Sequence, residues 1–384
     1  MLMRAPAGRP EPHRNPRHVR QLWHDESRNS PALGCNACPE KKLCGGICAA
    51  APYFDCLTYC CNKPAECGSV CRLQPKFADR MWEVRGLDLG NVPRAQVLAS
   101  PMLPRSAPIL FHGNSRSAAV SPPCAALPLY AMFKRGSGQA RTNSPEELRD
   151  TYRLAPATQL LLTGTDEDPP IERWWELGTS RRATIIRAMR QAGVSMTSTP
   201  NYSLTLNVPR WDDLYAMKRI ALVHAEFLDE GMPAALHING RTNTDFKRWA
   251  DFIAARDEIT HVAYEFTTGS GWAARRRQHT AWLTGLAADV GRPLHLVVRG
   301  GVDLLRLFTA AFRDVTFLES DSFMKTVKRR RAVLADNGRI TWNAAPTEPG
   351  ASLDELLTAN MATMQTYLEF LVTAPPPGNA GGRI

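Results

Sequence analysis

Long hydrophobic runs are missing from this chain. No window reaches the roughly 18 consecutive apolar residues that a membrane-spanning helix needs, and residues 1–30 contain no apolar core of a secretory signal peptide. We therefore expect a cytoplasmic protein that does not interact with a membrane. Thiols stay reduced in that compartment, so clustered cysteines are expected to bind a metal or to react before they form disulfides.

Several familiar catalytic motifs are also missing. The sequence has no Walker loop, no GxGxxG, no HExxH and no GxSxG. Their absence removes the usual nucleotide-hydrolase, zincin and serine-hydrolase interpretations.

Acidic residues are fewer than basic ones, with 37 Asp and Glu against 47 Lys and Arg and a formal net charge of +10. This balance favours an anionic small molecule or nucleic acid as partner. Residues 1–30 are rich in Pro and Arg and lack hydrophobic periodicity, which predicts a disordered basic arm. Residues 373–384 are expected to form a flexible tail. The runs Arg275–Arg277 and Lys328–Arg331 are expected within helices, where a solvated helix face also explains them.

Cysteine is rare outside one block. Of the ten cysteines, only Cys124 lies outside residues 35–71. A buried packing role is expected for this small side chain, with a nucleophile as the alternative. We predict a small metal-binding domain over residues 31–80. The candidate cofactor ligands are Cys35, Cys38, Cys44, Cys48, Cys56, Cys60, Cys67 and Cys71, with Cys61 beside them.

The first four of these cysteines have a distinctive spacing, C-x2-C-x5-C-x3-C, with Gly45-Gly46 inside the last interval. This spacing resembles the cysteine core of the SPASM auxiliary domains of radical-SAM enzymes, and the resemblance implies that Cys35, Cys38, Cys44 and Cys48 ligate a [4Fe–4S] cluster. The C-x3-C-x2-C signature of the SAM-binding cluster is absent. Radical-SAM chemistry is therefore not expected.

The remaining thiols leave the number of clusters open. Nine cysteines suffice for one four-cysteine cluster with spares or for two clusters. Zinc is the alternative metal, because C-x2-C is also a zinc half-site, although a second C-x2-C or an H-x3-H is missing. Free or disulfide-bonded thiols are the third possibility, and with either metal a purely structural role stays open.

From residue 109 onward, short apolar runs alternate with longer segments of helical period. The expected strands begin at Ile109, Leu127, Leu160, Val194, Ala234, Thr260, Leu294 and Val315. The expected helices span residues 144–152, 170–193, 211–231, 244–256, 271–291 and 352–372. Eight alternations predict an α/β fold, a TIM-like (β/α)8 barrel over residues 100–372, with a doubly wound open sheet as the alternative. One further strand candidate, from Arg339, indicates either an extra hairpin or an error among the eight.

Polar side chains gather at the predicted carboxyl ends of these strands. Alternate residues of a barrel strand face the interior, and this parity puts His237, Glu265 and Arg299 on the inner side, opposite apolar residues. Active sites of such barrels lie at the carboxyl ends of the strands. The predicted catalytic residues are Asn201, Asn239, Glu265, Arg299 and Asp321, with His112, Asp166, Asp168 and Thr267 as neighbours.

The pair Glu265 and Arg299 suggests a chemical role. A carboxylate beside a cation serves either as a base that stays ionised or as an anchor for a substrate carboxylate or phosphate. The following "RGG", Arg299–Gly301, lies where barrels often bind phosphate on backbone amides, although the two glycines suit a turn equally well. The alternative for the whole set is a hydrogen-bonded network without function.

A second resemblance covers the barrel half. The sequence from Leu160 to Phe252, with "PNYS" at residues 200–203 after a strand, is similar to an uncharacterised group of phage- and plasmid-associated bacterial proteins. The resemblance implies no particular activity. Two functional hypotheses follow: an iron–sulfur barrel enzyme that acts on an anionic or nucleotide-like substrate, or a metal-stabilised nucleic-acid-binding protein of a mobile genetic element.

Metal analysis tests the cysteine block directly. After anaerobic purification we expect a brown protein with a broad absorption band near 400 nm and about four or eight irons per chain, with matching sulfide. A colourless protein with stoichiometric zinc would refute the cluster and favour a structural or nucleic-acid-binding module.

Overall fold

The computed structural model describes residues 80, 83–112, 115–204, 210–271 and 273–373. The predicted basic arm, the cysteine block with all eight candidate ligands, and residues 374–384 of the tail lie outside the described residues. Their predictions stay as stated.

The described residues divide into two compact units. The first contains those within Met1–Arg94, Tyr202–Val223 and Asn239–Phe252, and the second contains those within Ala95–Asn201, His224–Ile238 and Ile253–Ile384. The first unit includes the 3-10 turn η4 (Leu89–Asn91). The division does not test the predicted domain boundaries.

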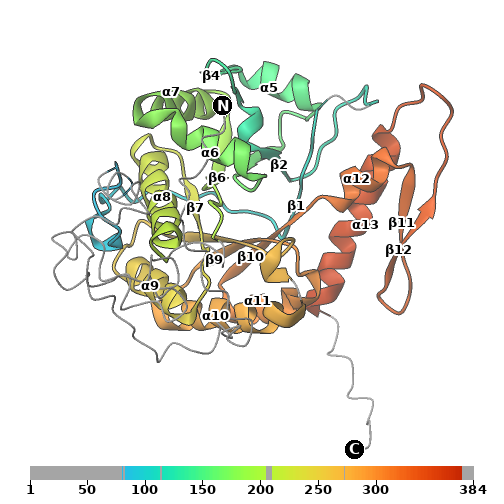
Figure 1. Cartoon of the computed structure of the whole chain (residues 1–384). Coiled ribbons are helices and arrows are strands. Elements are labelled where there is room, and N and C mark those ends of the chain that lie inside the picture. The colour runs from blue at the N-terminus through green and yellow to red at the C-terminus, as the bar shows by residue number, and fades with distance from the viewer. Residues whose placement is uncertain (1–79, 81–82, 113–114, 205–209, 272, 374–384) are drawn as a thin grey trace, which may run out of the picture. The chain divides into compact units, whose positions relative to one another are not determined.

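Eight parallel strands form the sheet of the second unit (Figure 1). They are β1 (Ser106–Pro108), β2 (Cys124–Pro128), β5 (Gln159–Thr163), β6 (Val194–Ser198), β7 (Ala234–His237), β8 (His261–Glu265), β9 (His295–Arg299) and β10 (Asp314–Glu319). Their order is β1-β10-β9-β8-β7-β6-β5-β2. The two outer strands meet through a parallel bridge between Ile109 and Ala126, where Leu110 N donates to Ala126 O at 2.9 Å.

This sheet is a nearly closed eight-stranded α/β barrel, so the predicted TIM-like fold is confirmed. An open doubly wound sheet is excluded, because chain neighbours are spatial neighbours around the sheet and its two edges meet. The first two strands lie earlier in the chain than predicted. The apolar run beyond Leu127 misled the prediction, since Leu129 and Tyr130 are buried in the 3-10 turn η5 (Leu129–Ala131).

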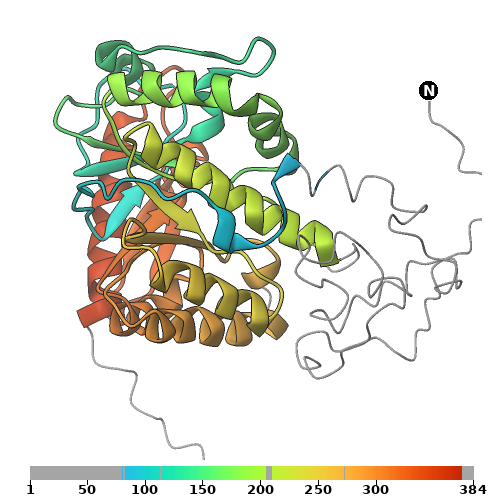
Figure 2. The same cartoon turned by 90° about the vertical axis from the view of Figure 1, so that its left-hand side faces the viewer.

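The helices that alternate with the strands along the chain mostly follow the predicted pattern. They are α5 (Pro145–Tyr152), α6 (Asp168–Glu176), α7 (Gly178–Gln191), α8 (Arg210–Asp229), α9 (Asn243–Ala254), α10 (Ala273–Val290), α11 (Leu305–Ala311), α12 (Asp321–Val327) and α13 (Asp354–Thr373). Within the second unit, α5–α7, α10–α11 and α13 lie on different sides of the strands (Figures 1 and 2). The single helix predicted over 170–193 is two helices, since Gly178 has a φ of 73° and interrupts the helical backbone.

Local side-chain chemistry explains one helix start. Ser144 Oγ accepts a hydrogen bond from Glu147 N at 3.1 Å and caps α5, with Pro145 as the first helical residue. The short strands β3 (Phe133–Lys134) and β4 (Gln139–Ala140) form a separate antiparallel pair between β2 and α5.

The segment after α12 is an antiparallel hairpin of β11 (Arg330–Leu334) and β12 (Ile340–Ala344). The extra hairpin expected near Arg339 is therefore present. The prediction that Lys328–Arg331 is helical is wrong: α12 ends at Val327, Arg329 has a φ of 52°, and Arg330 begins β11. Pairing with β12 outweighs helix propensity here.

The barrel interior is filled by small and medium apolar side chains from all eight strands. One buried cluster contains Ala107, Ile109, Cys124, Ala126, Leu161, Met196, Ala235, Ala263, Val297 and Leu318. Because residues from every strand meet in one cluster, it marks the inner face of the barrel. The packing role expected for Cys124 is confirmed, and burial raises the pKa of its thiol to about 12.

Two histidines occupy the amino-terminal ends of β8 and β9. The rings of His261 and His295 stack with centroids 4.6 Å apart, and His295 Nε2 lies 2.9 Å from Thr316 Oγ1. Burial lowers the pKa of His261 to about 3 and that of His295 to about 4, so both rings are neutral at pH 7.

Among the described residues, none of the helices combines the length and apolar character that crossing a membrane requires.

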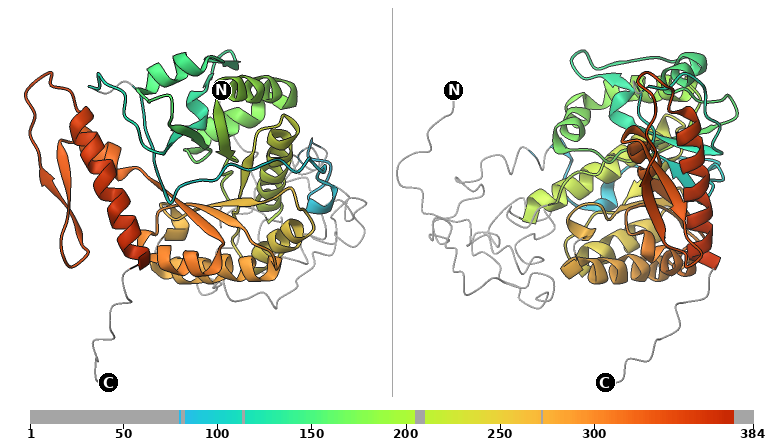
Figure 3. Two further views of the ribbon diagram at one scale, coloured as in Figure 1. Left: turned by 180° about the vertical axis from the view of Figure 1, so that it is seen from behind. Right: turned by 90° about the vertical axis from the view of Figure 1, so that its right-hand side faces the viewer.

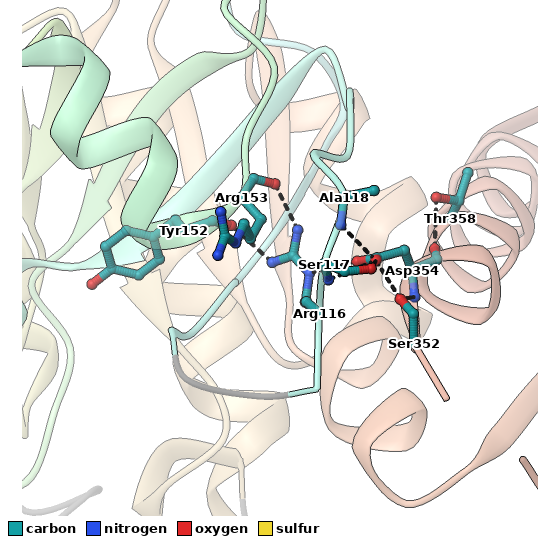
Figure 4. A network of polar contacts seen from close by, with 8 residues as sticks. All are labelled: Arg116, Ser117, Ala118, Tyr152, Arg153, Ser352, Asp354 and Thr358. Atoms are coloured by element: carbon teal, nitrogen blue, oxygen red, sulfur yellow. Dashed lines mark hydrogen bonds and ion pairs between the residues drawn. The ribbon is translucent and has the colours of Figure 1, made fainter. Parts of the chain in front are cut away.

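A polar network fastens α13 to the loop between β1 and β2 (Figure 4). The carboxylate of Asp354 accepts hydrogen bonds from Ser117 N at 2.8 Å, Ala118 N at 2.7 Å and the Ser352 hydroxyl. Arg116 lies 3.4 Å from the same carboxylate. It also donates to the carbonyl oxygens of Tyr152 at 2.8 Å and of Arg153 at 2.6 Å, at the end of α5.

The substitution Asp354→Asn is expected to destabilise the protein by about 3 kcal/mol, because it leaves the buried Arg116 guanidinium without its anion. Burial opposes ionisation of Asp354, yet hydrogen bonds from Ser352, Ala118 and Ser117 lower its pKa to about 2. The ionised form therefore stabilises the fold above the ordinary pKa, and this contribution is lost as the pH falls towards 2. Thermal melts at pH 7, 5 and 3 should show that the difference in melting temperature between the wild type and Asp354→Asn becomes smaller as the pH falls.

The matched control is Asp336→Asn, at an exposed position in the turn of the β11–β12 hairpin. We expect no change in its melting temperature. An Asp354→Asn protein that melts like this control would contradict a structural role for the network.

Candidate functional site

The carboxyl ends of β8 and β9 bring an acidic and a basic residue together inside the second unit. Glu265 ends β8 and Arg299 ends β9, and the two residues are direct register partners. Arg299 Nη1 lies 3.8 Å from Glu265 Oε2. The Glu265 side chain is 2% exposed, whereas that of Arg299 is 27% exposed. The carboxylate is therefore buried, and the cation beside it is partly accessible to solvent. The predicted pair is present.

The register of the strands also supports the prediction that Glu265 and Arg299 face the barrel interior. Ala263 and Val297 belong to the interior cluster, and Glu265 and Arg299 each follow them by two residues on the same strands. His237, the partner of Ala263 in register, has its ring 6.5 Å from that of Tyr264, centroid to centroid. Burial lowers the pKa of His237 to about 3, so its ring is neutral.

Hydrogen bonds hold one oxygen of Glu265 and leave the other available. Oε1 accepts from Thr267 N at 2.7 Å and from the Thr267 hydroxyl. Oε2 accepts no hydrogen bond of ordinary length and angle from a described residue, and the buried Nε of Arg299 likewise donates none. A buried acceptor and a buried donor of adjacent strands therefore have capacity for a ligand.

Opposing influences act on the pKa of Glu265. Burial raises its pKa, while the charge of Arg299 and hydrogen bonds from Thr267 and Thr165 lower it. The net shift is upward. A carboxyl group whose pKa is raised, next to a cation that a substrate is able to engage, has the properties of a general base.

Glycines allow the backbone at this end of β8 and β9 to pack closely. Gly300 has a φ of 75°, and a Cβ there would lie 2.9 Å from Thr267 N. Gly301 has a φ of 69° and precedes the 3-10 turn η7 (Val302–Leu304). Both glycines are therefore required as turn residues, and a phosphate cradle on their amides stays a prediction.

Asn201 lies just beyond the carboxyl end of β6, which β7 separates from β8 in the sheet. Its N donates to Gly164 O at 3.2 Å, and Gly164 N in turn donates to Ser198 Oγ at 2.9 Å. A Cβ on Gly164 would lie 2.4 Å from Thr199 O, so only glycine permits this approach of the chain after β5 to the chain after β6. The Asn201 residue is half-buried.

The other two predicted residues have different surroundings. Asn239 belongs to the first unit, where its Nδ2 donates to Tyr202 O at 2.9 Å and its carbonyl oxygen accepts from Trp249 Nε1 at 2.8 Å. That Asn239 belongs to the same catalytic site as Glu265 stays a prediction. Asp321 is the exposed first residue of α12, directly after β10. Asp166 and Asp168 are exposed after β5, in the chain segment that leads into α6.

The predicted neighbour His112 lines a cavity of about 320 Å³. The other lining residues are Phe111, Ser115, Arg116, Asp150, Thr151 and Arg153. The His112 ring lies edge-on to that of Tyr152, with centroids 5.8 Å apart. Arg116, the most buried cation of this cavity, is engaged by Asp354 and by two carbonyl oxygens (Figure 4). The cavity is thus built around a structural arginine.

Sequence reasoning missed a second buried carboxyl group, Glu319, at the end of β10. Its Oε2 accepts from Ser322 N at 2.8 Å, while its buried Oε1 has no hydrogen-bond partner among the described residues. Burial raises the pKa of Glu319 to about 7. The sequence did contain a sign of this residue, because Glu319 is the one acid at the end of the apolar strand "VTFLE". Strand alternation puts Glu319 on the side opposite to the inward-facing Leu318, and the prediction considered only inward-facing polar residues.

The described residues contain no group of three or more His, Cys, Asp or Glu side chains positioned to hold a metal ion. No protein-family model matches the chain, and no curated protein is found as a relative. The two resemblances inferred from sequence therefore stay predictions.

We predict that Glu319→Gln stabilises the protein at alkaline pH. A pKa raised from 4.5 to about 7 means that the folded state holds a proton that the unfolded state has lost. The protonated carboxyl group therefore makes its full contribution to the free energy of unfolding below pH 4.5. This contribution, on the order of 3 kcal/mol, is lost as the pH rises through 7. Melting temperatures of variant and wild type should agree near pH 4 and diverge by pH 8.

The control for this experiment is Asp336→Asn, which removes an exposed acid in the turn of the β11–β12 hairpin. Its difference from the wild type should not depend on pH over the same range. If Glu319→Gln behaves in the same way, Glu319 is ionised in the native protein and the assignment is wrong.

Proposed function

We propose that this protein is an enzyme that binds an anionic substrate, such as a phosphate-bearing nucleotide, at the carboxyl end of its barrel. Arg299 is the proposed anion anchor and Glu265 the proposed general base. The single observation that carries the proposal is the adjacent pair of Glu265 and Arg299, in which neither Glu265 Oε2 nor Arg299 Nε makes a hydrogen bond of ordinary length and angle to a described residue although both atoms are buried. Asn201 and Asp321 are proposed to contact the substrate from other strand ends.

The chemistry of the pair follows from its electrostatics. An anion bound to Arg299 offsets the positive charge 3.8 Å from the carboxylate, and this loss of the stabilising cation raises the pKa of Glu265 further. A base whose pKa rises towards neutrality when substrate binds removes a proton most effectively in the complex. Thr267 keeps Oε1 fixed, so Oε2 is the oxygen that receives the proton.

The cysteine block is proposed to hold one or two [4Fe–4S] clusters through Cys35, Cys38, Cys44 and Cys48, with Cys56, Cys60, Cys67 and Cys71 as further ligands and zinc as the alternative metal. A bound cluster supplies one-electron redox chemistry. The spacing of the cysteines alone supports this part of the proposal.

Ligand-induced stabilisation tests the anion anchor. Inorganic phosphate, pyrophosphate and nucleoside mono- and diphosphates are titrated into the full chain while the melting temperature is followed. At least one of these anions is expected to stabilise the wild type, with at least tenfold weaker affinity in Arg299→Met. Glu265→Gln should keep the binding and, once a turnover assay exists for the bound compound, reduce the rate by about 10²-fold or more.

The matched control is Arg313→Met, which removes another arginine beside an acidic neighbour, Asp314, at the opposite end of β10. Its affinity should equal that of the wild type. Equal binding by Arg299→Met and Arg313→Met would refute the anchor, and full turnover by Glu265→Gln would refute the base.

A further inference from the structure

Six cations gather on the hairpin that follows the last barrel strand. They are Lys325, Lys328, Arg329, Arg330, Arg331 and Arg339. We call residues 325–344 the basic hairpin: the end of α12, the turn after it, and β11 and β12. The only acid in this stretch is Asp336, which lies in the turn between the two strands.

None of these six cations forms an ion pair with a described acid, in contrast to arginines elsewhere in the second unit. Arg116, Arg182 and Arg256, for example, each pair with a carboxylate. In the basic hairpin, Arg329 Nε donates to Thr347 Oγ1 at 2.9 Å and Arg330 Nη1 to Trp342 O at 3.3 Å, bonds that leave the charges uncompensated. Such a concentration of positive charge without acidic partners favours the binding of a polyanion.

The hairpin is held firmly by one buried residue of α13. Asn360 Oδ1 accepts from Ala332 N, and Asn360 Nδ2 donates to Arg330 O, each at 2.8 Å. These bonds satisfy the edge of β11 that β12 does not cover, as a neighbouring strand would. In Figures 1 and 3 the hairpin lies on the side of α13 that faces away from the barrel strands.

Strand alternation separates the two faces of the hairpin. Ala332 is buried and Trp342 is half-buried on one face, where Lys325 Nζ lies 5.7 Å from the centre of the Trp342 ring. The residues of opposite parity are all exposed: Arg331, Val333, Arg339, Thr341 and Asn343. The outer face therefore offers cations, a hydroxyl and an amide, and it contains no acid.

We infer that the basic hairpin binds duplex DNA, with its outer face against the phosphate backbone and in the major groove. A two-stranded β-ribbon fits the major groove of B-DNA, which is about 12 Å wide, whereas the major groove of A-form RNA is too deep and narrow to admit it. Arginine and lysine supply the phosphate contacts, and Thr341 and Asn343 are able to meet base edges. An anionic membrane fits less well, because Val333 is the only apolar side chain among the exposed outer-face residues.

This inference does not depend on the proposed catalytic pair, because Glu265 and Arg299 are not part of the hairpin. The experiment uses the full chain and a fluorescently labelled 20-base-pair duplex, with anisotropy measured from 50 to 200 mM salt. In Arg331→Ala/Arg339→Ala two phosphate contacts are lost, so binding weakens and the slope of log K against log salt becomes shallower by about 2. The control, Arg181→Ala/Arg277→Ala, removes two exposed arginines elsewhere in the second unit and should bind like the wild type.

Each alternative outcome is distinct. Equal weakening in the two double variants would mean that net charge alone causes binding and would overturn the inference, as would unchanged binding in the hairpin variant or no binding by the wild type. Duplex RNA, single-stranded DNA or anionic vesicles of phosphatidylserine and phosphatidylcholine bound more tightly than duplex DNA would also overturn it. Because the substituted side chains are exposed, both variants should keep the wild-type melting temperature, which is measured on the same samples.

Discussion

Closure of the parallel sheet is the constraint on which the rest of this structure depends. The bridge between Ile109 and Ala126 brings the two outer strands together, and Leu110 N donates to Ala126 O at this point of the otherwise open edge. Small interior residues make this closure possible. Alanines at positions 107, 126, 235 and 263 leave room for Leu161, Met196 and Leu318 to meet across the barrel.

Closure also collects the carboxyl ends of all eight strands at one rim, where polar side chains are buried at a cost. Glu265 is compensated by Thr267 and Arg299. Glu319 accepts a hydrogen bond from Ser322 N but forms no ion pair with a described cation, and burial outweighs its hydrogen bonds and raises its pKa to about 7. At the opposite rim, His261 and His295 meet the same cost by remaining neutral. The proposed site is thus one of several places where burial and ionisation compete.

The last helix connects two features that are distant in sequence. Asp354, at the start of α13, is held by the loop that follows β1, and Asn360, two turns further along, holds the edge of β11. The basic hairpin is therefore displayed on an element that is itself tied to the barrel. The six cations of the basic hairpin have no acidic partner among the described residues, whereas Arg299 lies 3.8 Å from Glu265. The two groups of cations therefore differ in how far their charge is already compensated within the protein.

The sequence by itself determined the barrel, because alternating short apolar runs and amphipathic segments follow from the periods of strands and helices, which are local properties. Strand parity likewise determined that Glu265 and Arg299 share the inner side at the ends of β8 and β9. Only the tertiary structure decided features that depend on distant partners. Lys328–Arg331 leaves the helical pattern because β12 and Asn360 bind it. Glu319 acquires its pKa from burial that no local pattern records, and Arg116 becomes structural because Asp354, 238 positions later, supplies its anion.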